Sequence, residues 1–210
     1  AGDYNSAMSD FACAVTLRPD CADAYNNRGA VYKKVGAYDK AIEDFNHALR
    51  IKSNDPGIHY NLGICYKQIG LYDKALQSFN RAIDMNPLDE KSRNSRGNIY
   101  AQQGEFDRAI EDYTEAIKIN PYYGDAYNNR GNVYSETGQY DKATGDFTEA
   151  LKLNPRPDVY YNRCLVYFTI GEYDRAWEDV EKIEAMGYKV DKAFLDKLRK
   201  ADRDFRDFKD

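Results

Sequence analysis

The sequence of 210 residues has few of the residues that mark catalytic, metal-binding or disulfide-bonded proteins. It contains two histidines and four cysteines, and the cysteines have neither a CxxC spacing nor a nearby histidine pair, which argues against a metal site. The net charge of -5 and the absence of lysine or arginine runs argue against nucleic-acid binding. No segment reaches the roughly 20 consecutive apolar residues of a membrane helix, so no membrane insertion is expected.

Proline is also scarce, with six residues, whereas 42% of the chain is hydrophobic and 31% is charged. This balance is typical of a mostly helical protein. The first residues, AGDYNSAM, lack the charged and apolar regions of a signal peptide. Because residue 1 falls inside a repeat, a targeting segment could lie upstream of it, and the cellular compartment is left open.

Glycines reveal an internal repeat. One series is spaced by 34 residues and consists of Gly29, Gly63, Gly97 and Gly131. A second series has the same spacing until its last member, which follows after 33 residues, and consists of Gly2, Gly36, Gly70, Gly104, Gly138 and Gly171. One residue has therefore been lost near the turn at residues 154–157.

With Ala22 as position 1, the chain divides into repeats of helical hairpins. Residues 1–21 form the second helix of a truncated repeat, and the five complete repeats are 22–55, 56–89, 90–123, 124–156 and 157–190. In each repeat, a small residue at position 8 and tyrosine at position 11 share one face of a first helix. Glycine at position 15 marks the turn, and an aspartate at position 18 is expected to satisfy free N–H groups and the dipole of the second helix.

The second helix carries alanine at positions 20 and 27 and, in four repeats, an aromatic residue at position 24, as in Ala41, Phe45 and Ala48. These spacings give an apolar stripe that needs a neighbouring hairpin to cover it. Proline ends the second helix at position 32 or begins the next helix at position 1.

This pattern resembles the tetratricopeptide repeat family over nearly the whole chain. The resemblance implies an all-α fold, a right-handed superhelical α-solenoid of helix-turn-helix hairpins whose first helices line a concave groove. The last repeat departs from the family pattern at Cys164, Val180, Ile183 and Tyr188.

The two ends of the chain differ. After Tyr188, one apolar stripe at helical spacing runs through Val190, Phe194, Leu198, Ala201, Phe205 and Phe208 among charged residues, which predicts a C-terminal capping helix over residues 191–210. A partner-binding or membrane-surface helix is the alternative. At the other end, Tyr4, Ala7, Phe11 and Ala14 form the apolar face of a second helix whose first helix is missing, so we expect the natural protein to extend further towards its N-terminus.

Arginine replaces the family's usual leucine at position 7 in four repeats, and the same four repeats carry aspartate at position 23. The only exception is the second repeat, which has Leu62 and Ser78. This co-variation predicts ion pairs within repeats, bidentate where geometry permits. The predicted pairs are Arg28–Asp44, Arg96–Asp112, Arg130–Asp146 and Arg163–Asp179.

In this family the groove is lined chiefly by positions 2, 5, 6, 9, 12 and 13 of the first helix. Here these positions are rich in asparagine, whose amide both donates and accepts hydrogen bonds and can pair with the backbone of an extended peptide. The candidate groove residues are Asn27, Asn61, Asn94, Asn98, Asn128, Asn129, Asn132, Asn162, Lys33, Lys67 and Tyr161. The alternatives are that the asparagines serve the scaffold and that the lysines form a solvated face.

Asn94, Asn98, Asn128 and Asn132 are the best single patch, because residues four apart face the same way. The carboxylate clamp of some relatives is matched only by Asn61 and Lys91 and is not matched by Asn26, Ala30 and Ser95, which argues against a receptor for acidic chaperone tails.

Catalysis would need a converging nucleophile, acid and base, and no such set, and no cofactor motif, occurs in the sequence. The sequence therefore predicts a non-enzymatic interaction module that binds an extended peptide or a helix of another protein. The alternative is a structural scaffold that self-associates through its uncapped N-terminal edge or its convex face.

Overall fold

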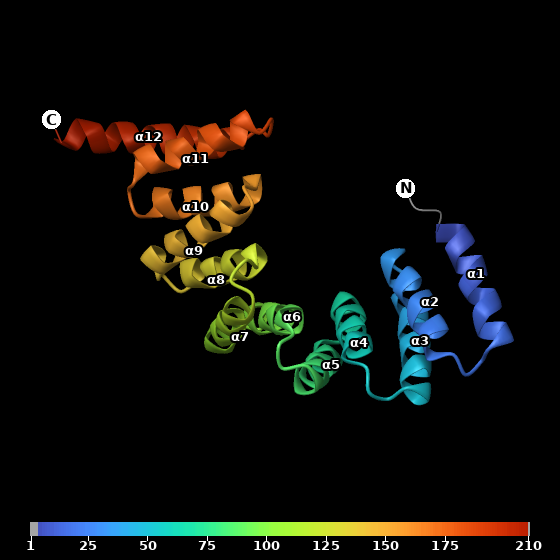
Figure 1. Cartoon of the computed structure of the whole chain (residues 1–210). Helices are drawn as coiled ribbons and strands as arrows, with labels where there is room; N and C mark the ends of the chain where they lie inside the picture. The colour runs from blue at the N-terminus through green and yellow to red at the C-terminus, as the bar shows by residue number, and fades with distance from the viewer. Residues whose placement is uncertain (1–3, 210) are drawn as a thin grey trace. The chain divides into compact units, whose positions relative to one another are not determined.

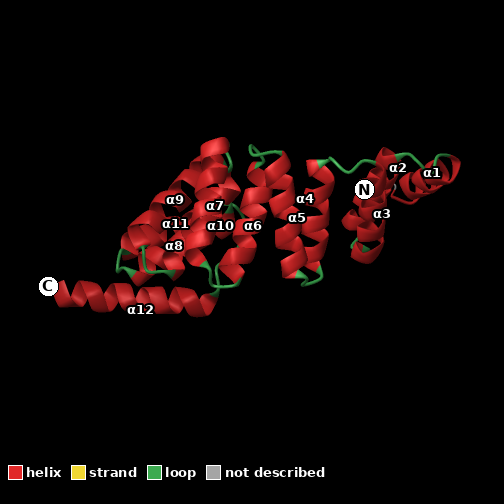
Figure 2. Ribbon diagram, turned by 90° about the horizontal axis from the view of Figure 1, so that it is seen from below, coloured by secondary structure: helices red, strands yellow, loops and turns green. Residues whose placement is uncertain are grey.

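A computed structural model describes residues 4–209 and consists of helices joined by short loops (Figures 1 and 2). The described residues contain no strand. In order the helices are α1 (Tyr4–Leu17), α2 (Ala22–Lys34), α3 (Tyr38–Ile51), α4 (Pro56–Gln68), α5 (Tyr72–Met85), α6 (Glu90–Gln102), α7 (Phe106–Ile119), α8 (Gly124–Glu136), α9 (Tyr140–Leu153), α10 (Pro157–Thr169), α11 (Tyr173–Ala185) and α12 (Lys192–Lys209). The prediction of an all-α chain of helical hairpins is confirmed.

The chain forms two compact units, residues 1–103 and residues 104–210. In the first unit α2 packs on α3 and α4 packs on α5 as hairpins, and α1 and α6 cover the two ends of this stack. In the second unit the hairpins are α8–α9 and α10–α11, with α7 packed on α8 and α12 packed on α11. The repeat at 90–123 contributes α6 to the first unit and α7 to the second.

The turn glycines at position 15 have a structural requirement that no other residue meets as well. Gly36, Gly70, Gly104, Gly138 and Gly171 have φ values between 74° and 80°, a region that favours glycine. The next residue returns its N–H to the carbonyl of the position-11 tyrosine, as in Ala37 to Tyr32 at 2.9 Å and Gln139 to Tyr134 at 2.7 Å. This hydrogen bond closes the C-terminus of the first helix.

The small residue at position 8 is required by the ring at position 24 of the same hairpin. A Cβ atom on Gly29 would lie 2.9 Å from the ring of Phe45, and one on Gly63 would lie 2.5 Å from Phe79. Both rings are fully buried. Glycine therefore lets the two helices of a hairpin approach until the ring rests on the backbone of the first helix.

Two aspartates at position 18 do not make the backbone hydrogen bonds that the sequence suggested. Asp39 and Asp73 lie in the first turns of α3 and α5, but the N-cap residues are Ala37 and Leu71, and these have no side-chain cap hydrogen bond. The two carboxylates lie where the helix dipole favours a negative charge. Side-chain caps occur instead before two first helices, where Asp55 accepts from the N–H groups of Gly57 and Ile58, and Asp89 does the same for α6.

The last helix, α12, covers the hairpin α10–α11, as the C-terminal stripe predicted. Phe194 and Leu198 are buried in a cluster with Cys164, Tyr167 and Val180. Val190 and Ala201 are partly buried, and the side chains of Phe205 and Phe208 lie outside the described residues, as do Gly2 and the side chains of Tyr4 and Ala7. The cap therefore closes the second unit with aromatic contacts.

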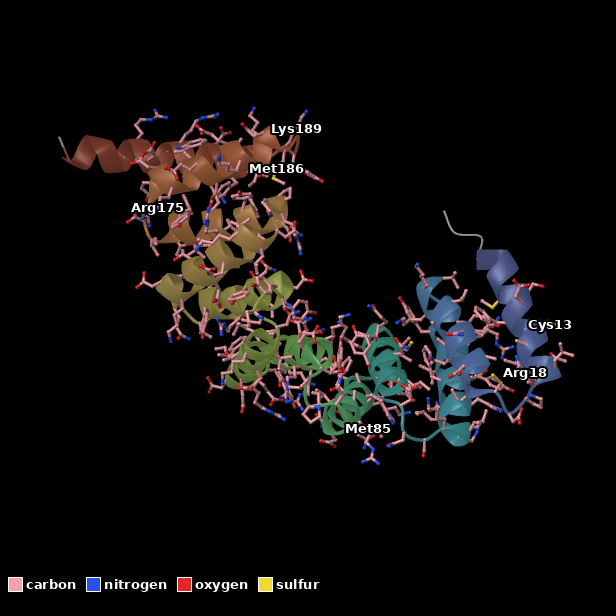
Figure 3. The ribbon with its side chains drawn as sticks, in the orientation of Figure 1. Cys13, Arg18, Met85, Arg175, Met186 and Lys189 are labelled. Carbon is pink, nitrogen blue, oxygen red and sulfur yellow. The ribbon has the colours of Figure 1, made fainter. Side chains whose placement is uncertain are left out.

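All four cysteines are free thiols. Cys13 is exposed on α1 (Figure 3), whereas Cys65 and Cys164 are fully buried in the two cores. Burial raises the pKa of Cys65 to about 11 and that of Cys164 to about 12. Both therefore behave as small apolar core residues near neutral pH.

Candidate functional site

The predicted groove residues lie on the first helices of both units. Those on α2, α4 and α6, here called the first-unit surface, are Asn27, Lys33, Asn61, Lys67, Asn94 and Asn98. Those on α8 and α10, called the second-unit surface, are Asn128, Asn129, Asn132, Tyr161 and Asn162. The patch of four asparagines expected from the sequence is thus divided between the units, with Asn94 and Asn98 in the first and Asn128 and Asn132 in the second.

A lysine–asparagine hydrogen bond links two repeats on the first-unit surface. Lys33, at position 12 of α2, donates from Nζ to Oδ1 of Asn61, at position 6 of α4, over 2.5 Å. Both side chains are partly buried, and this burial lowers the pKa of Lys33. The bond gives each residue a scaffold role in addition to its place on the surface.

Lys67 is at position 12 of α4, the position that Lys33 holds in the preceding repeat, but its surroundings differ. Its partly buried ammonium group has no hydrogen bond or ion pair within residues 4–209, and burial lowers its pKa. At position 6 of the next repeat stands Ser95, whose side chain is hydrogen-bonded to Tyr60. Lys67 therefore has no amide oxygen at the position where Asn61 accepts the hydrogen bond of Lys33.

The other amides of the first-unit surface range from exposed to buried. Asn27 is exposed, Asn98 is partly buried and Asn94 is buried. Asn26, at position 5 of α2, holds its Oδ1 atom buried without a hydrogen-bond partner in the described part of the chain. An unpaired buried carbonyl oxygen is costly, because it has lost water without gaining a donor.

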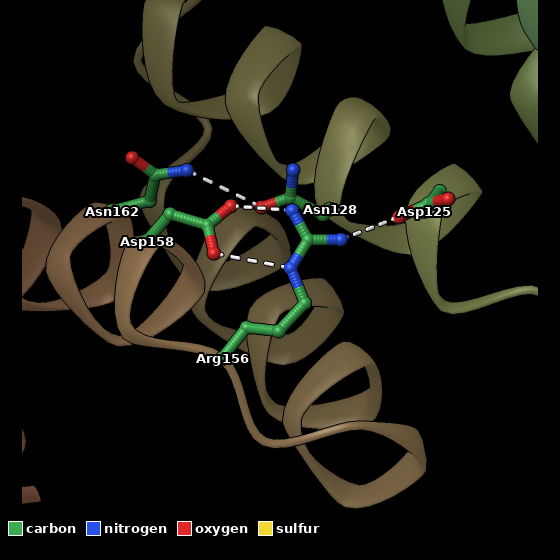
Figure 4. Close-up of polar contacts among 5 residues, drawn as sticks. All are labelled: Asp125, Asn128, Arg156, Asp158 and Asn162. Carbon is green, nitrogen blue, oxygen red and sulfur yellow. Dashed lines mark hydrogen bonds and ion pairs between the residues drawn. The ribbon is translucent and has the colours of Figure 1, made fainter. Parts of the chain in front are cut away.

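On the second-unit surface, one amide pair bridges neighbouring repeats. Asn162 donates from Nδ2 to Oδ1 of Asn128 over 3.2 Å (Figure 4). Asn128 is buried, Asn129 and Asn162 are partly buried, and Asn132 is exposed. Asn132 therefore presents its amide to solvent, whereas Asn128 supports the packing of α8 against α10.

Tyr161 lies at position 5 of α10, and its ring packs against the cap. The ring centroids of Tyr161 and Phe194 are 5.6 Å apart in an edge-to-face arrangement, and Phe168 contacts Phe194 at the same distance. The aromatic end of the expected groove is thus partly covered by α12.

Beside the second-unit amide pair lies an ion-pair network that the sequence reasoning did not single out (Figure 4). Arg156 binds Asp158 through Nε at 3.1 Å and Nη2 at 2.6 Å, and its Nη1 donates to Asp125 over 2.6 Å. Both aspartates are at position 2 of their repeats. The arginine holds the pKa of Asp158 below its usual value. The missing residue of this repeat was the only sequence signal at the turn.

Three of the four predicted arginine–aspartate pairs form within repeats and are bidentate. Arg28 binds Asp44 through Nε at 2.8 Å and Nη2 at 2.7 Å. Arg130 binds Asp146 at 2.7 and 2.8 Å. Arg163 binds Asp179 at 3.0 and 2.6 Å. The aspartates are buried, so these pairs belong to the scaffold. The pair Arg96–Asp112 would join the two units and stays a prediction.

The described residues contain neither a candidate metal site nor a candidate membrane helix. Among the described residues, no group of three or more histidine, cysteine, aspartate or glutamate side chains could hold a metal ion. None of the described helices combines the length and the apolar character needed to cross a membrane.

The repeated hairpins have glycine turns and, in all but the last, a buried ring at position 24, and they define a helical-hairpin repeat protein. Family models described as tetratricopeptide repeat match residues 20–87 and 124–157, and one described as TPR repeat matches residues 97–138. The chain therefore belongs to the tetratricopeptide repeat family. A search of curated protein sequences found no significant match.

Solved structures of the same fold support this assignment. The crystal structure of MamA matches with 27% identity and a TM-score of 0.67 over 72% of this chain and 89% of MamA. A tetratricopeptide repeat protein from Parabacteroides merdae matches with 25% identity and a TM-score of 0.74 over 94% of this chain and 78% of its own. YrrB, described as a TPR protein with an unusual peptide-binding site, matches with 20% identity and a TM-score of 0.65 over 82% and 90%.

Proposed function

We propose that this protein is a non-catalytic interaction module whose first-unit surface binds an extended peptide segment of another protein. The observation that carries the proposal is the partly buried ammonium group of Lys67, which has no acceptor in the described part of the chain. An ammonium group that has lost water and gained no partner is stabilised when a ligand oxygen approaches it.

Another residue of the first-unit surface has the mixed hydrogen-bonding character that an extended backbone requires. Asn27 is exposed on α2, and its amide offers both a donor and an acceptor. An extended peptide carries an N–H and a C=O on nearly every residue, so such a surface can hold its main chain with little regard to sequence. YrrB, which has this fold, is described as having a peptide-binding site.

The test starts from peptides, because the natural partner is not identified. A displayed library of random peptides is selected on the immobilised full chain, and the affinities of the enriched peptides are measured for the wild type and for Lys67→Met. We expect a loss of about tenfold or more for Lys67→Met, as befits one charge-assisted hydrogen bond. Lys40→Met, on the second helix α3, is the matched control and leaves binding unchanged.

Two results would contradict the proposal. One is that no peptide is enriched above bare matrix. The other is that every enriched peptide binds Lys67→Met as tightly as the wild type. Asn98→Ala and Asn132→Ala, measured separately, then test whether the asparagines of each unit contribute to peptide binding. Light scattering over a range of protein concentrations measures the self-associating alternative, in which the mass rises with concentration.

A further inference from the structure

In the second unit, the guanidinium group of the position-7 arginine lies in a slot between two tyrosine rings, an aspartate and a threonine. The guanidinium of Arg130 lies 5.9 Å from the ring centroid of Tyr127 and 5.7 Å from that of Tyr134. It binds Asp146 on one side and donates from Nη1 to Oγ1 of Thr114 over 2.9 Å. Arg163 has the equivalent surroundings, with tyrosines at positions 4 and 11, an aspartate at position 23 and a threonine at position 25 of the preceding repeat.

The second repeat lacks this guanidinium, and a pocket lies in its place. The pocket measures about 410 Å³. Its wall contains Leu62 at position 7, Tyr66 at position 11 and Ser78 at position 23. His59 stands at position 4, and Asn46 stands at position 25 of the preceding repeat. These are the positions that surround the guanidinium groups of Arg130 and Arg163, so the pocket lies where those repeats hold a guanidinium.

The wall of this pocket carries positive charge and no carboxylate. No carboxylate lines the pocket, because Ser78 replaces the aspartate, whereas Lys74 and Arg81 stand at its wall. Within the described residues Arg81 and Asn46 make no hydrogen bond or ion pair. The Lys74 ammonium lies 5.7 Å from the ring centroid of Tyr66. Burial, and to a lesser degree the charge of Arg81, lowers the pKa of His59, which places these basic groups within electrostatic reach of one another.

We propose that this pocket binds an organic carboxylate carried on a short apolar stem. A carboxylate is planar, like the guanidinium group that fills the slot in other repeats, and Arg81 can bind it through two N–H groups. The Lys74 ammonium and the Asn46 amide supply further donors. Leu49, Leu62 and Tyr66 provide the apolar wall for the stem. The pocket uses positions 4, 7 and 11 of α4, not the groove positions, so it is independent of the proposed peptide site.

Two sources offer this chemistry, a free small carboxylate and the acidic side chain of a partner. The probes are 3-phenylpropionate for the first and the α-amide of N-acetylglutamate for the second, with neutral 3-phenylpropanamide as the control. Each is titrated into the isotope-labelled full chain, and amide chemical shifts are followed. We expect saturable shifts at Asn46, Leu62 and Ser78 with dissociation constants in the millimolar range, as befits ligands of this size. The tighter of the two carboxylates identifies the source.

The other repeats suggest a control variant in which an arginine side chain fills the pocket. Leu62→Arg with Ser78→Asp restores the pair found in other repeats, keeps or raises the melting temperature, and abolishes the titration. Arg81→Gln keeps the fold and weakens carboxylate binding by about tenfold or more. The proposal is overturned if pocket residues show no saturable shift, if 3-phenylpropanamide binds as tightly as 3-phenylpropionate, or if the pair-restored variant binds as the wild type does.

Discussion

Cys164 and Val180 change size together in the last hairpin. In three other hairpins a glycine at position 8 lies against a phenylalanine ring from position 24, as Gly63 does against Phe79. In the last hairpin the thiol group of Cys164 occupies this space, and position 24 holds the smaller Val180. Both are buried, and Sγ of Cys164 lies 3.3 Å from the carbonyl oxygen of Ala176. The thiol group of Cys164 therefore fills part of the volume that the smaller Val180 side chain leaves empty.

This exchange predicts a coupled effect on stability. Val180→Phe alone forces a ring onto the Cys164 thiol and destabilises the chain by about 1–3 kcal/mol, as overpacking does. Cys164→Gly with Val180→Phe restores the pattern of the other hairpins and recovers most of that loss. Thermal unfolding followed by circular dichroism measures both variants. Equal melting temperatures for the single and double variants would contradict the pairing.

The arginine–aspartate pairs predict a second coupling. Arg130→Leu strands the buried Asp146 carboxylate and costs about 3–5 kcal/mol. Adding Asp146→Ser reproduces the natural combination of Leu62 and Ser78, so the double variant is more stable than the single one by about 1–3 kcal/mol. Chemical denaturation of the wild type, both single variants and the double variant gives the coupling energy. Strictly additive losses would reject it.

The cap predicts a local effect in the second unit. Phe194→Ala removes a buried ring that contacts Tyr161 and Phe168, at a cost of about 3–5 kcal/mol. Trp177 is the single tryptophan and lies 5.9 Å from the guanidinium of Arg199 on α12, so its fluorescence reports cap docking. We expect the emission to change at a lower temperature in Phe194→Ala than in the wild type. Lys197→Ala, an exposed change on the same helix, should leave the transition in place.

The buried thiols predict both reactivity and pH dependence. Because their pKa values are raised from 9.0 to about 11 for Cys65 and about 12 for Cys164, folding favours the protonated thiols. Their contribution to stability is present below pH 9 and is lost as the pH rises through these folded-state values. In a native thiol assay with an aromatic disulfide reagent, Cys13 reacts first, the partly buried Cys21 reacts more slowly, and the buried pair reacts only on unfolding.

The control for the thiol assay is Cys13→Ser, which should remove the fast phase. Rapid reaction of Cys65 or Cys164 in the native protein, or stability that rises between pH 9 and pH 11, would contradict the burial described above.

Sequence periodicity predicted the hairpins because each repeated residue type answers a local need. Gly138 must adopt a positive φ, and Gly131 must admit the Phe147 ring, so both recur wherever those needs recur. The ion pairs were predictable for a different reason. Arginine at position 7 and aspartate at position 23, such as Arg130 and Asp146, occur together in four repeats and are both missing from the second. This co-variation indicated their contact from the sequence.

The candidate site was less predictable because its contacts join different repeats. Lys33 and Lys67 both stand at position 12 of their repeats, so their own repeats do not distinguish them. The difference lies at position 6 of the following repeat, which holds Asn61 as the acceptor of Lys33 but Ser95 next to Lys67. The partner of Tyr161 comes from α12, which follows the repeats and shares no position with them. Such contacts depend on which two repeats are neighbours, and a repeat pattern describes each repeat alone.

The ring of Phe45 rests on Gly29 of its own hairpin, and the same holds for Phe79 with Gly63. A gene duplication or deletion of a whole hairpin therefore keeps the ring together with the glycine that it packs on, and the interior of the hairpin is unchanged. What must be matched anew are the bonds across junctions, such as Lys33 with Asn61 and Asn162 with Asn128. The length of such a chain can change by whole hairpins, and each change leaves its mark at a junction.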